Sequence, residues 1–405
     1  MTSVILKRGR DESLRRFHPW IFSGAVDAVE GSPYEGETVA VLACDRSCLG
    51  FGHYQKGSIA VRILSFNRDF IPSDDGRMPL AFWEDRIGKA LSMRRALGLP
   101  SSATDCYRLV HGEGDSLPGL IVDVYGDVAV LQAHSAGMYL SVDLVSEALM
   151  RCSAGLLKAV YNKSSATAPH KAGLDLCDGY VTAYEGQDEG TVKENGNQFY
   201  VNWASGQKTG FFLDQRDNRE LVGAYARGRN VLNLFCYTGG FSVYALNNGA
   251  ASVTSVDSSQ TAVDMLRRNV ELNICQASGS VGRHDAVCAD ALDYLRDTET
   301  GKFDLMVVDP PAFAKHRDVL DNALRAYRRL NASAIGRIAP GGLLFTYSCS
   351  QAVDRRAFEL AVFSAAAQTG RSVRILRRLT QPADHPVSIY HPEGDYLKGL
   401  MLYVE

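Results

Sequence analysis

The chain has 405 residues, of which 46% are hydrophobic, and a formal net charge of -3 at pH 7. This composition is too apolar for an intrinsically disordered protein, and the length suits two or three packed domains. No run approaches the roughly 20 apolar residues that span a bilayer, and the amino terminus lacks a signal peptide's apolar core and cleavage site, so we expect a cytoplasmic protein with no membrane partner.

The nine cysteines are scattered through apolar segments, without a CxxC pair or the Cys/His spacing of a zinc site. In a reducing compartment most such cysteines are small core residues. Cys44 and Cys48 lie close together, but nothing near them in the sequence would complete a metal shell. We therefore expect no structural metal.

The first predicted domain covers residues 1–72. Short β-like runs (VILKR, TVAVLAC, SIAVRILSF) alternate with Gly-rich turns, which indicates a small β-rich module. The polar stretch at 67–79 is typical of a linker. Five basic residues outnumber the two acidic residues among them and predict a local positive face: Lys7, Arg8, Arg10, Arg15 and Arg16.

A central α+β domain is expected over residues 73–188. The spacing of apolar residues predicts a helix over 80–97, which Gly98 and Pro100 would end. Two strands around a turn at 125–127, a helix over 142–150 and a strand near 156–163 follow. No catalytic constellation is recognisable in this region.

From residue 189 to 405 strands and helices alternate, which is typical of a doubly wound α/β domain. Within it, Val263, Leu266 and Val270 repeat at helical spacing after Ser258 or Ser259, either of which would cap the helix. The fold class is therefore α/β at the carboxyl terminus, preceded by the β-rich and the α+β domains.

The segment VLNLFCYTGGFS predicts a strand, a glycine turn and a helix. Gly239 and Gly240 allow the backbone to bend and to approach a ligand closely, and Phe235 and Tyr237 would line the same turn. The amino terminus of the following helix suits an anion such as the carboxylate of S-adenosylmethionine. A GG turn alone is also compatible with an ordinary strand-to-helix connection.

Three carboxylates follow successive predicted strands. Asp257 is placed to accept the ribose hydroxyls of a nucleoside, and Asp290 could accept from the adenine amino group. A lone Asp is more often a helix cap, but its recurrence at strand ends favours a cofactor site. Asp309 begins a rigid Asp-Pro-Pro exit from the sheet, with Phe313 nearby as an aromatic surface for a base.

Cys349 follows the predicted strand GLLFTYS, at the same edge of the sheet as Asp309. A thiolate there could attack C6 of a pyrimidine and make C5 able to accept a methyl group. The alternative is an inert core cysteine. Ser348 and Ser350 flank the residue, and we interpret them as the polar surroundings of a sheet edge, which favours the nucleophile.

These residues, in this order, resemble the large-subunit ribosomal RNA cytosine-5 methyltransferase I family, over nearly the whole chain. KRGRDESLRRFHPWIFSGAV is similar to the opening of its PUA domain, and HGEGDSLPGLIVDVYGD to its central domain. The catalytic part is similar through GQKTGFFLDQRDNR, NLFCYTGGFS, VDSS, DPPAF and YSCS, and the ending through DHPVSIYHPEGDYLKGL.

The resemblance implies an enzyme that methylates a cytosine at C5 in ribosomal RNA with S-adenosylmethionine as the donor. Cys349 would be the covalent nucleophile, and Asp309 would hold or protonate the base at N3. Gln215 and Arg216 would close over the methionine end of the cofactor, although Arg216 could equally be a salt-bridge partner at the sheet edge. Pro311 and Ala312 replace the second cysteine of other RNA cytosine-5 methyltransferases, so the base that removes the C5 proton is not identified.

The residues are also compatible with two alternatives. The first is a guanine-nitrogen methyltransferase of the same architecture, which would need no cysteine nucleophile. The second is a non-catalytic RNA-binding assembly factor, which would not need the carboxylates at the strand ends. A dehydrogenase is disfavoured because the turn lacks GxGxxG spacing. The expected partner is ribosomal RNA, and a homodimer is left open.

Overall fold

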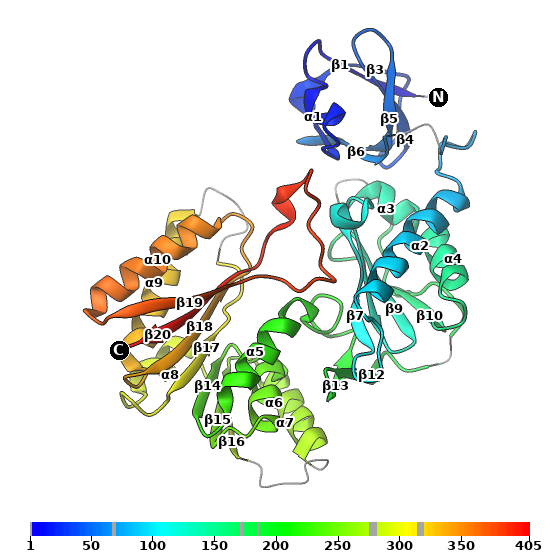
Figure 1. Ribbon diagram of the computed structural model, residues 1–405. Helices are drawn as coiled ribbons and strands as arrows, with labels where there is room; N and C mark the ends of the chain where they lie inside the picture. Colours follow the sequence, from blue (N-terminus) through cyan, green and yellow to red (C-terminus); the bar gives the residue numbers. More distant parts are fainter. Residues whose placement is uncertain (1, 67–69, 171–172, 185, 275–281, 314–319) are drawn as a thin grey trace. The chain divides into compact units, whose positions relative to one another are not determined.

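The computed structural model describes residues 2–66, 70–170, 173–184, 186–274, 282–313 and 320–405 (Figure 1). Its contacts divide the chain into two compact units. Unit 1 comprises Met1–Val192, Val201–Leu213 and Ala383–Gly394, and unit 2 comprises Lys193–Tyr200, Asp214–Pro382 and Asp395–Glu405. The domain boundaries expected at residues 72 and 188 stay a prediction. None of the described helices is both long and apolar enough to cross a membrane.

The amino-terminal part of unit 1 is the expected β-rich module. Its six-stranded sheet has the order β2-β6-β5-β4-β1-β3, and only the β1–β4 pair is parallel. Alternating apolar residues such as Val39 and Val41 point into a small core with Leu14 of the short helix. The elements are β1 Ser3–Leu6, α1 Glu12–Arg15, β2 Trp20–Phe22, β3 Val26–Glu30, β4 Thr38–Leu42, β5 Cys48–Tyr54 and β6 Ile59–Ser65.

The expected linker lies partly outside the described residues, because 67–69 are not among them. The stretch from 70 to Pro79 has no helix or strand. The helix expected over 80–97 is α2, Leu80–Ala96, and it buries Phe82, Trp83 and Ile87 in the core of the central domain.

The central sheet of unit 1 has five strands in the order β11-β10-β9-β8-β7. The predicted pair of strands, the helix near 142–150 and the strand near 156–163 are confirmed. The elements are β7 Cys106–His111, β8 Leu120–Tyr125, β9 Val128–Ala133, α3 Ala136–Leu140, α4 Val142–Cys152, β10 Ala159–Asn162 and β11 Gly179–Tyr180. A separate two-stranded sheet pairs β12, Glu189–Glu194, with β13, Asn197–Asn202.

Unit 2 contains the predicted doubly wound sheet, with seven strands in the order β16-β15-β14-β17-β18-β20-β19. The first five are parallel, whereas β20 runs antiparallel to both neighbours. The strands are β14 Asn230–Leu234, β15 Ser252–Asp257, β16 Arg283–Cys288, β17 Leu305–Val308, β18 Gly342–Ser348, β19 Val373–Leu379 and β20 Lys398–Val404. The strand order reverses at β14, so ligands are expected beyond its carboxyl end.

Helices cover both faces of this sheet (Figure 1). One layer holds α5, α6 and α7, and the other holds α8, α9 and α10. Their bounds are α5 Arg216–Ala226, α6 Gly240–Asn247, α7 Gln260–Ile274, α8 Ala291–Asp297, α9 Leu320–Arg337 and α10 Arg355–Thr369. A large apolar core lies between the strands and the second layer and includes Leu234, Val308, Tyr327 and Phe358. The apolar face of each helix therefore fixes the strands whose ends carry the site.

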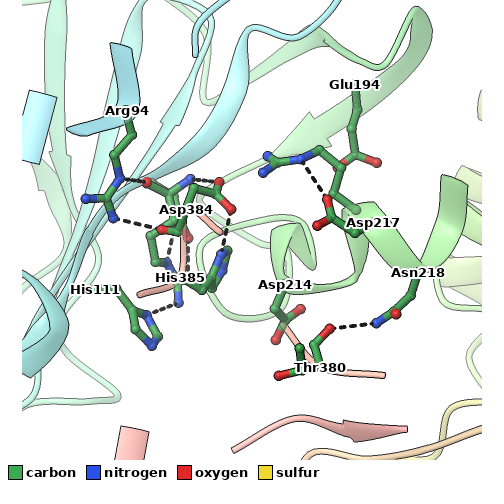
Figure 2. A network of polar contacts seen from close by, with 12 residues as sticks. Arg94, His111, Glu194, Asp214, Asp217, Asn218, Thr380, Asp384 and His385 are labelled. Carbon is green, nitrogen blue, oxygen red and sulfur yellow. Dashed lines mark hydrogen bonds and ion pairs between the residues drawn. The ribbon is translucent and has the colours of Figure 1, made fainter. Parts of the chain in front are cut away.

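The segment 383–394, between β19 and β20, is bound into unit 1 by buried charged groups. Figure 2 shows Asp384 beside Arg94 of α2, whose Nη2 donates to the Asp384 carbonyl oxygen at 2.7 Å. The Arg108 N–H donates to Asp384 Oδ2 at 3.0 Å, and Asp384 Oδ1 lies 3.0 Å from Nδ1 of His385. Both Asp384 and His385 are fully buried. Such charge-assisted hydrogen bonds hold the segment in place, because moving it away would leave buried charges without a partner, which is costly.

Candidate active site

The predicted cofactor turn follows β14 and is conformationally strained. Phe235 and Tyr237 have φ angles of 58° and 46°, and Gly239 has 87°. The left-handed region costs a residue with a side chain about 1–2 kcal/mol, so two such residues in one turn need strong support from their surroundings. Strain of this kind clusters at ligand sites, which agrees with the predicted role of this turn.

Hydrogen bonds from neighbouring strands and helices hold the turn. The Tyr237 N–H donates to Asp257 Oδ2 at 2.9 Å, and the Ser259 N–H donates to Asp257 Oδ1 at 2.9 Å. Asn269 of α7 donates from Nδ2 to the Thr238 carbonyl oxygen at 2.8 Å. Asp257 ends β15 as predicted, and each carboxylate oxygen has a second lone pair with which it can accept a ribose hydroxyl. Ser259 is the expected cap of α7, since its Oγ accepts from the Ala262 N–H.

The two glycines of the turn are required by packing. A Cβ on Gly239 would lie 2.0 Å from Cδ1 of Leu266, and one on Gly240 would lie 2.8 Å from Cδ of Arg219. Arg219 is itself immobilised, because its Nε and Nη2 donate to the two carboxylate oxygens of Glu194 at 2.8 and 2.6 Å. Both partners are buried. The turn is therefore pressed against a rigid ion pair and α7.

Asp290 does not end a strand, which corrects the expectation from sequence. β16 ends at Cys288, and the Asp290 side chain caps α8 by accepting from the N–H groups of Leu292 and Asp293 at 2.8 and 3.1 Å. The residue is exposed. A carboxylate at the start of a helix is stabilised by the orphan N–H groups there, so the cap explains this residue locally. A contact from Asp290 to adenine stays a prediction.

Asp309 directly follows β17 and is positioned from α5 and the residues before it. Gln215 Nε2 donates to Asp309 Oδ2 at 2.9 Å, and Asn218 Nδ2 donates to Gln215 Oε1 at 2.6 Å. Gln215 and Asn218 are buried, so this amide chain holds the carboxylate in one orientation. Arg216 is also buried and forms an ion pair with Asp217 at 3.7 Å. Its predicted contact with the cofactor stays a prediction.

Cys349 directly follows β18 and is partly exposed, as predicted for a residue at the edge of the sheet. Its flanking serines are completely buried, which corrects the interpretation of them as polar edge surroundings. Ser348 Oγ donates to the hydroxyl of Tyr327 at 2.9 Å. Burial raises the pKa of Tyr327 to about 12, and the nearby charges of Cys349 and Asp309 act in the same direction. The thiol and the carboxyl group are thus neighbours of one buried phenol.

Lys398 is a residue of this site that the sequence reasoning missed. It begins β20 opposite Ser348 of β18 and is only 3% exposed. Its Nζ donates to the Ser350 carbonyl oxygen at 2.6 Å. Burial lowers the pKa of Lys398 to about 8, while Asp395 and Cys349 act to raise it. The sequence does contain a signal for this residue, a lysine within the apolar run YLKGLMLYV. Charged residues are rarely buried in a strand unless they have a partner or a function.

A positive face at the amino terminus of unit 1 stays a prediction. All five basic residues of this face are exposed, and Arg15 forms an ion pair with Asp11. The cations are therefore accessible to a polyanion, although an exposed charge alone is weak support for a binding site.

Comparison with known proteins first defines the class. Residues 176–401 match the family model described as S-adenosylmethionine-dependent methyltransferase, and residues 4–66 match a PUA-like domain. The fold is that of a candidate S-adenosylmethionine-dependent methyltransferase from Streptococcus mutans, with a TM-score of 0.82, 22% identity and 100% coverage of both chains. A structure of the candidate methyltransferase SMU.776 complexed with S-adenosylhomocysteine is equally similar. The chain is an S-adenosylmethionine-dependent methyltransferase.

Full-length relatives then define the family. The chain is 39% identical to ribosomal RNA large subunit methyltransferase I of Aeromonas salmonicida, over 98% of each chain. It is 40% identical to the protein of the same name from Aeromonas hydrophila, over 99% of this chain and 98% of that one. It is 39% identical to the one from Photobacterium profundum over the whole of both. The chain belongs to the ribosomal RNA large subunit methyltransferase I family.

Proposed function

We propose that the protein methylates carbon 5 of a cytosine in large-subunit ribosomal RNA through a covalent bond between Cys349 and C6 of the base. The relatives' names support the ribosomal RNA substrate. The observation that carries the cytosine-5 chemistry is the position of Cys349, a partly exposed thiol whose neighbour Tyr327 is also close to Asp309.

C5 of cytosine is a poor nucleophile until a group adds to C6. In the proposed reaction the Cys349 thiolate forms the S–C6 bond, which places the electron pair of the C5–C6 double bond on C5. Asp309, oriented by Gln215, acts as a carboxylic acid and donates its proton to N3, which offsets the negative charge that develops on the ring. S-adenosylmethionine, when bound, would supply the methyl group to C5 and leave as S-adenosylhomocysteine. A general base takes the C5 proton, the electron pair of the C5–H bond re-forms the C5–C6 double bond, and Cys349 leaves as a thiolate while N3 returns its proton to Asp309.

The surroundings of Cys349 suit a thiolate. The Lys398 ammonium is buried close by, and an adjacent cation attracts a thiolate electrostatically. Because Lys398 Nζ is bonded to the Ser350 carbonyl oxygen, one residue beyond Cys349, the cation keeps a fixed place relative to the thiol. Lys398 is thus proposed as a positioning and electrostatic residue for the nucleophile.

The proposal is tested by replacing Cys349 with Ala and measuring methyl transfer to ribosomal RNA that lacks the modification. We expect a loss of activity of at least about 1,000-fold, with unchanged affinity for S-adenosylmethionine in calorimetry, because the thiol is absent from the cofactor turn. Cys44→Ala, at an exposed cysteine of unit 1, is the matched control. Undiminished turnover by Cys349→Ala would end the covalent mechanism.

The product separates the competing functions. Mass spectrometry of nucleosides from the modified RNA should give 5-methylcytidine, whereas a methylated guanosine would establish the guanine-nitrogen alternative. RNA with 5-fluorocytidine at the target should trap a covalent adduct with the wild type and not with Cys349→Ala, because fluorine cannot leave C5 as a proton does. Failure of the wild type to bind S-adenosylmethionine would instead support a non-catalytic assembly factor.

A further inference from the structure

Three metal-ligating side chains from distant parts of the sequence meet in unit 1. His18 precedes β2, while His391 and Glu393 lie in the segment 383–394. One ligand atom from each residue lies within 4.8 Å of the other two. Nε2 of His18 is 3.7 Å from Glu393 Oε1, and Nε2 of His391 is 3.7 Å from Glu393 Oε2. All three residues belong to unit 1, whereas Cys349 belongs to unit 2.

The imidazole of His391 is buried without hydrogen bonds. The residue is 3% exposed, and neither ring nitrogen has a hydrogen-bond partner. The indole of Trp20 packs against it with ring centroids 4.3 Å apart, and Trp20 Nε1 donates to Glu113 Oε1 at 2.8 Å, which fixes the indole. A buried polar group without a partner is unfavourable, and such groups are rare in folded proteins. A ligand bound at Nε2 would remove this penalty.

Nδ1 of His18 lies between two backbone groups of Trp20, while Nε2 faces Glu393. In one tautomer Nδ1 accepts from the Trp20 N–H at 3.2 Å, and in the other it donates to the Trp20 carbonyl oxygen at 3.3 Å, so metal binding at Nε2 requires the second tautomer. In the tautomer that carries the proton on Nδ1, this proton is donated to the carbonyl oxygen and the lone pair on Nε2 is available. Histidines that bind metals usually donate their other N–H to a carbonyl or carboxylate in this way.

We propose that His18, His391 and Glu393 bind one divalent transition-metal ion, with Zn²⁺ the best match, and that the ion fixes the segment 383–394 against β2. Two imidazole nitrogens and one carboxylate are ligands that Zn²⁺ prefers, and three protein ligands leave a position for water. Bonds of about 2.0–2.1 Å in a tetrahedron place ligand atoms about 3.3 Å apart. The two 3.7 Å distances involve different oxygens of Glu393, and one ligand atom from each residue lies within 4.8 Å of the others, so binding needs adjustments of up to about 1.5 Å. The Glu393 side chain is 52% exposed and can make them.

The test uses the full-length protein without a polyhistidine tag, after treatment with a chelator. Zn²⁺ is titrated by calorimetry and by competition with a chromophoric chelator. We expect one ion per chain and a rise in the melting temperature of about 5 °C at saturating Zn²⁺, because an ion that binds only the folded state stabilises it. Co²⁺ in place of Zn²⁺ should give the intense visible bands of a tetrahedral site.

Three variants locate the ion. His391→Ala and Glu393→Gln should weaken Zn²⁺ binding at least about tenfold and remove the melting shift. Glu393→Gln keeps the shape of an exposed side chain, so it remains informative if His391→Ala fails to fold. His170→Ala, at an exposed histidine of the same unit, should bind like the wild type. Absence of micromolar binding by the wild type, or equal binding by Glu393→Gln, would overturn the proposal.

Discussion

The turn at residues 235–240 and the end of β18 are built in different ways. The turn is shaped by its own backbone, with positive φ angles at Phe235, Tyr237 and Gly239, and the adjacent β15 and α7 hold it. The end of β18 is conformationally ordinary, and its character comes from Tyr327 of α9 and Lys398 of β20. The proposed cofactor side therefore depends on shape, whereas the proposed nucleophile side depends on charge. Substitutions that add bulk should therefore impair the turn, and substitutions that remove a charge should impair the end of β18.

The largest effect is expected at Gly239. In Gly239→Ala the new Cβ meets Cδ1 of the fully buried Leu266 at 2.0 Å and also strains a φ of 87°, so the turn must move. Overpacking and strain together are worth about 2–5 kcal/mol, which predicts a loss of S-adenosylmethionine affinity of at least about 30-fold. Calorimetry with the cofactor measures it.

Gly249→Ala is the matched control for this substitution. Gly249 has almost the same φ, 85°, but its added Cβ would come no closer than 3.8 Å to Arg227. This variant should lose about 1 kcal/mol of stability from backbone strain alone and keep its cofactor affinity. Equal cofactor affinities of the two variants would show that the shape of the turn does not determine binding.

A charge change at the end of β18 should have the next largest effect. Lys398→Met keeps the length of the side chain and removes the cation beside Cys349, so we expect methyl transfer to fall by about 10- to 100-fold at neutral pH. Cofactor affinity should not change, because the turn is untouched. Single-turnover kinetics on ribosomal RNA measures the first effect and calorimetry the second. A parallel fall in both would contradict the separation of the two regions.

The same lysine predicts a pH dependence of stability. Its folded pKa of about 8 lies below the ordinary value of 10.5, so between these values the unfolded chain binds more protons than the folded one. The contribution of Lys398 to the free energy of unfolding should therefore rise as the pH increases from about 8 to 10.5, by at most about 3–4 kcal/mol. Urea unfolding at several pH values should show it as a stability difference between the wild type and Lys398→Met that grows over this range. Lys302→Met, at an exposed lysine of unit 2, should show no such growth.

The smallest effect is expected at Asp290, which lies at the sheet edge but caps α8. Asp290→Asn keeps a good cap, so stability should stay within about 0.5 kcal/mol of the wild type. Asp290→Ala removes the cap and should cost about 1 kcal/mol. Measuring both cofactor affinity and stability distinguishes a role of Asp290 in binding the cofactor from a role in capping α8. A tenfold loss of affinity in the stable Asp290→Asn variant would assign this carboxylate to the cofactor after all.

Local sequence patterns predicted the fold and the strand ends that carry most of the candidate site residues. Alternating strands and helices gave the doubly wound sheet, and Asp257, Asp309 and Cys349 were correctly placed at or directly after strands. These predictions succeeded because a strand, a glycine turn and a helix cap each depend on neighbouring residues. Asp290 was misplaced for the same reason, since a cap and a strand end differ by only two positions here.

Contacts between distant residues could not be predicted in this way. The proximity of Lys398 to Cys349 depends on the antiparallel insertion of β20 beside β18, and that register follows from the whole sheet. The ion pair of Arg219 with Glu194 and the meeting of His18 with His391 likewise join segments far apart in sequence. The spacing of the cysteines argued against a metal site formed by residues close together in sequence. It carries no information about a site formed by side chains from distant segments.

The return of residues 383–394 to unit 1 affects how the protein acquires its structure during synthesis. Arg94 and the Arg108 N–H group find a partner in Asp384, which the ribosome adds only after β14 to β19 have been made. Until then the Arg94 guanidinium has partners within the central domain, Asp115 and the Arg108 carbonyl oxygen, whereas the Arg108 N–H lacks Asp384. Domains usually fold in the order of translation, whereas here unit 1 receives one of the last segments to appear.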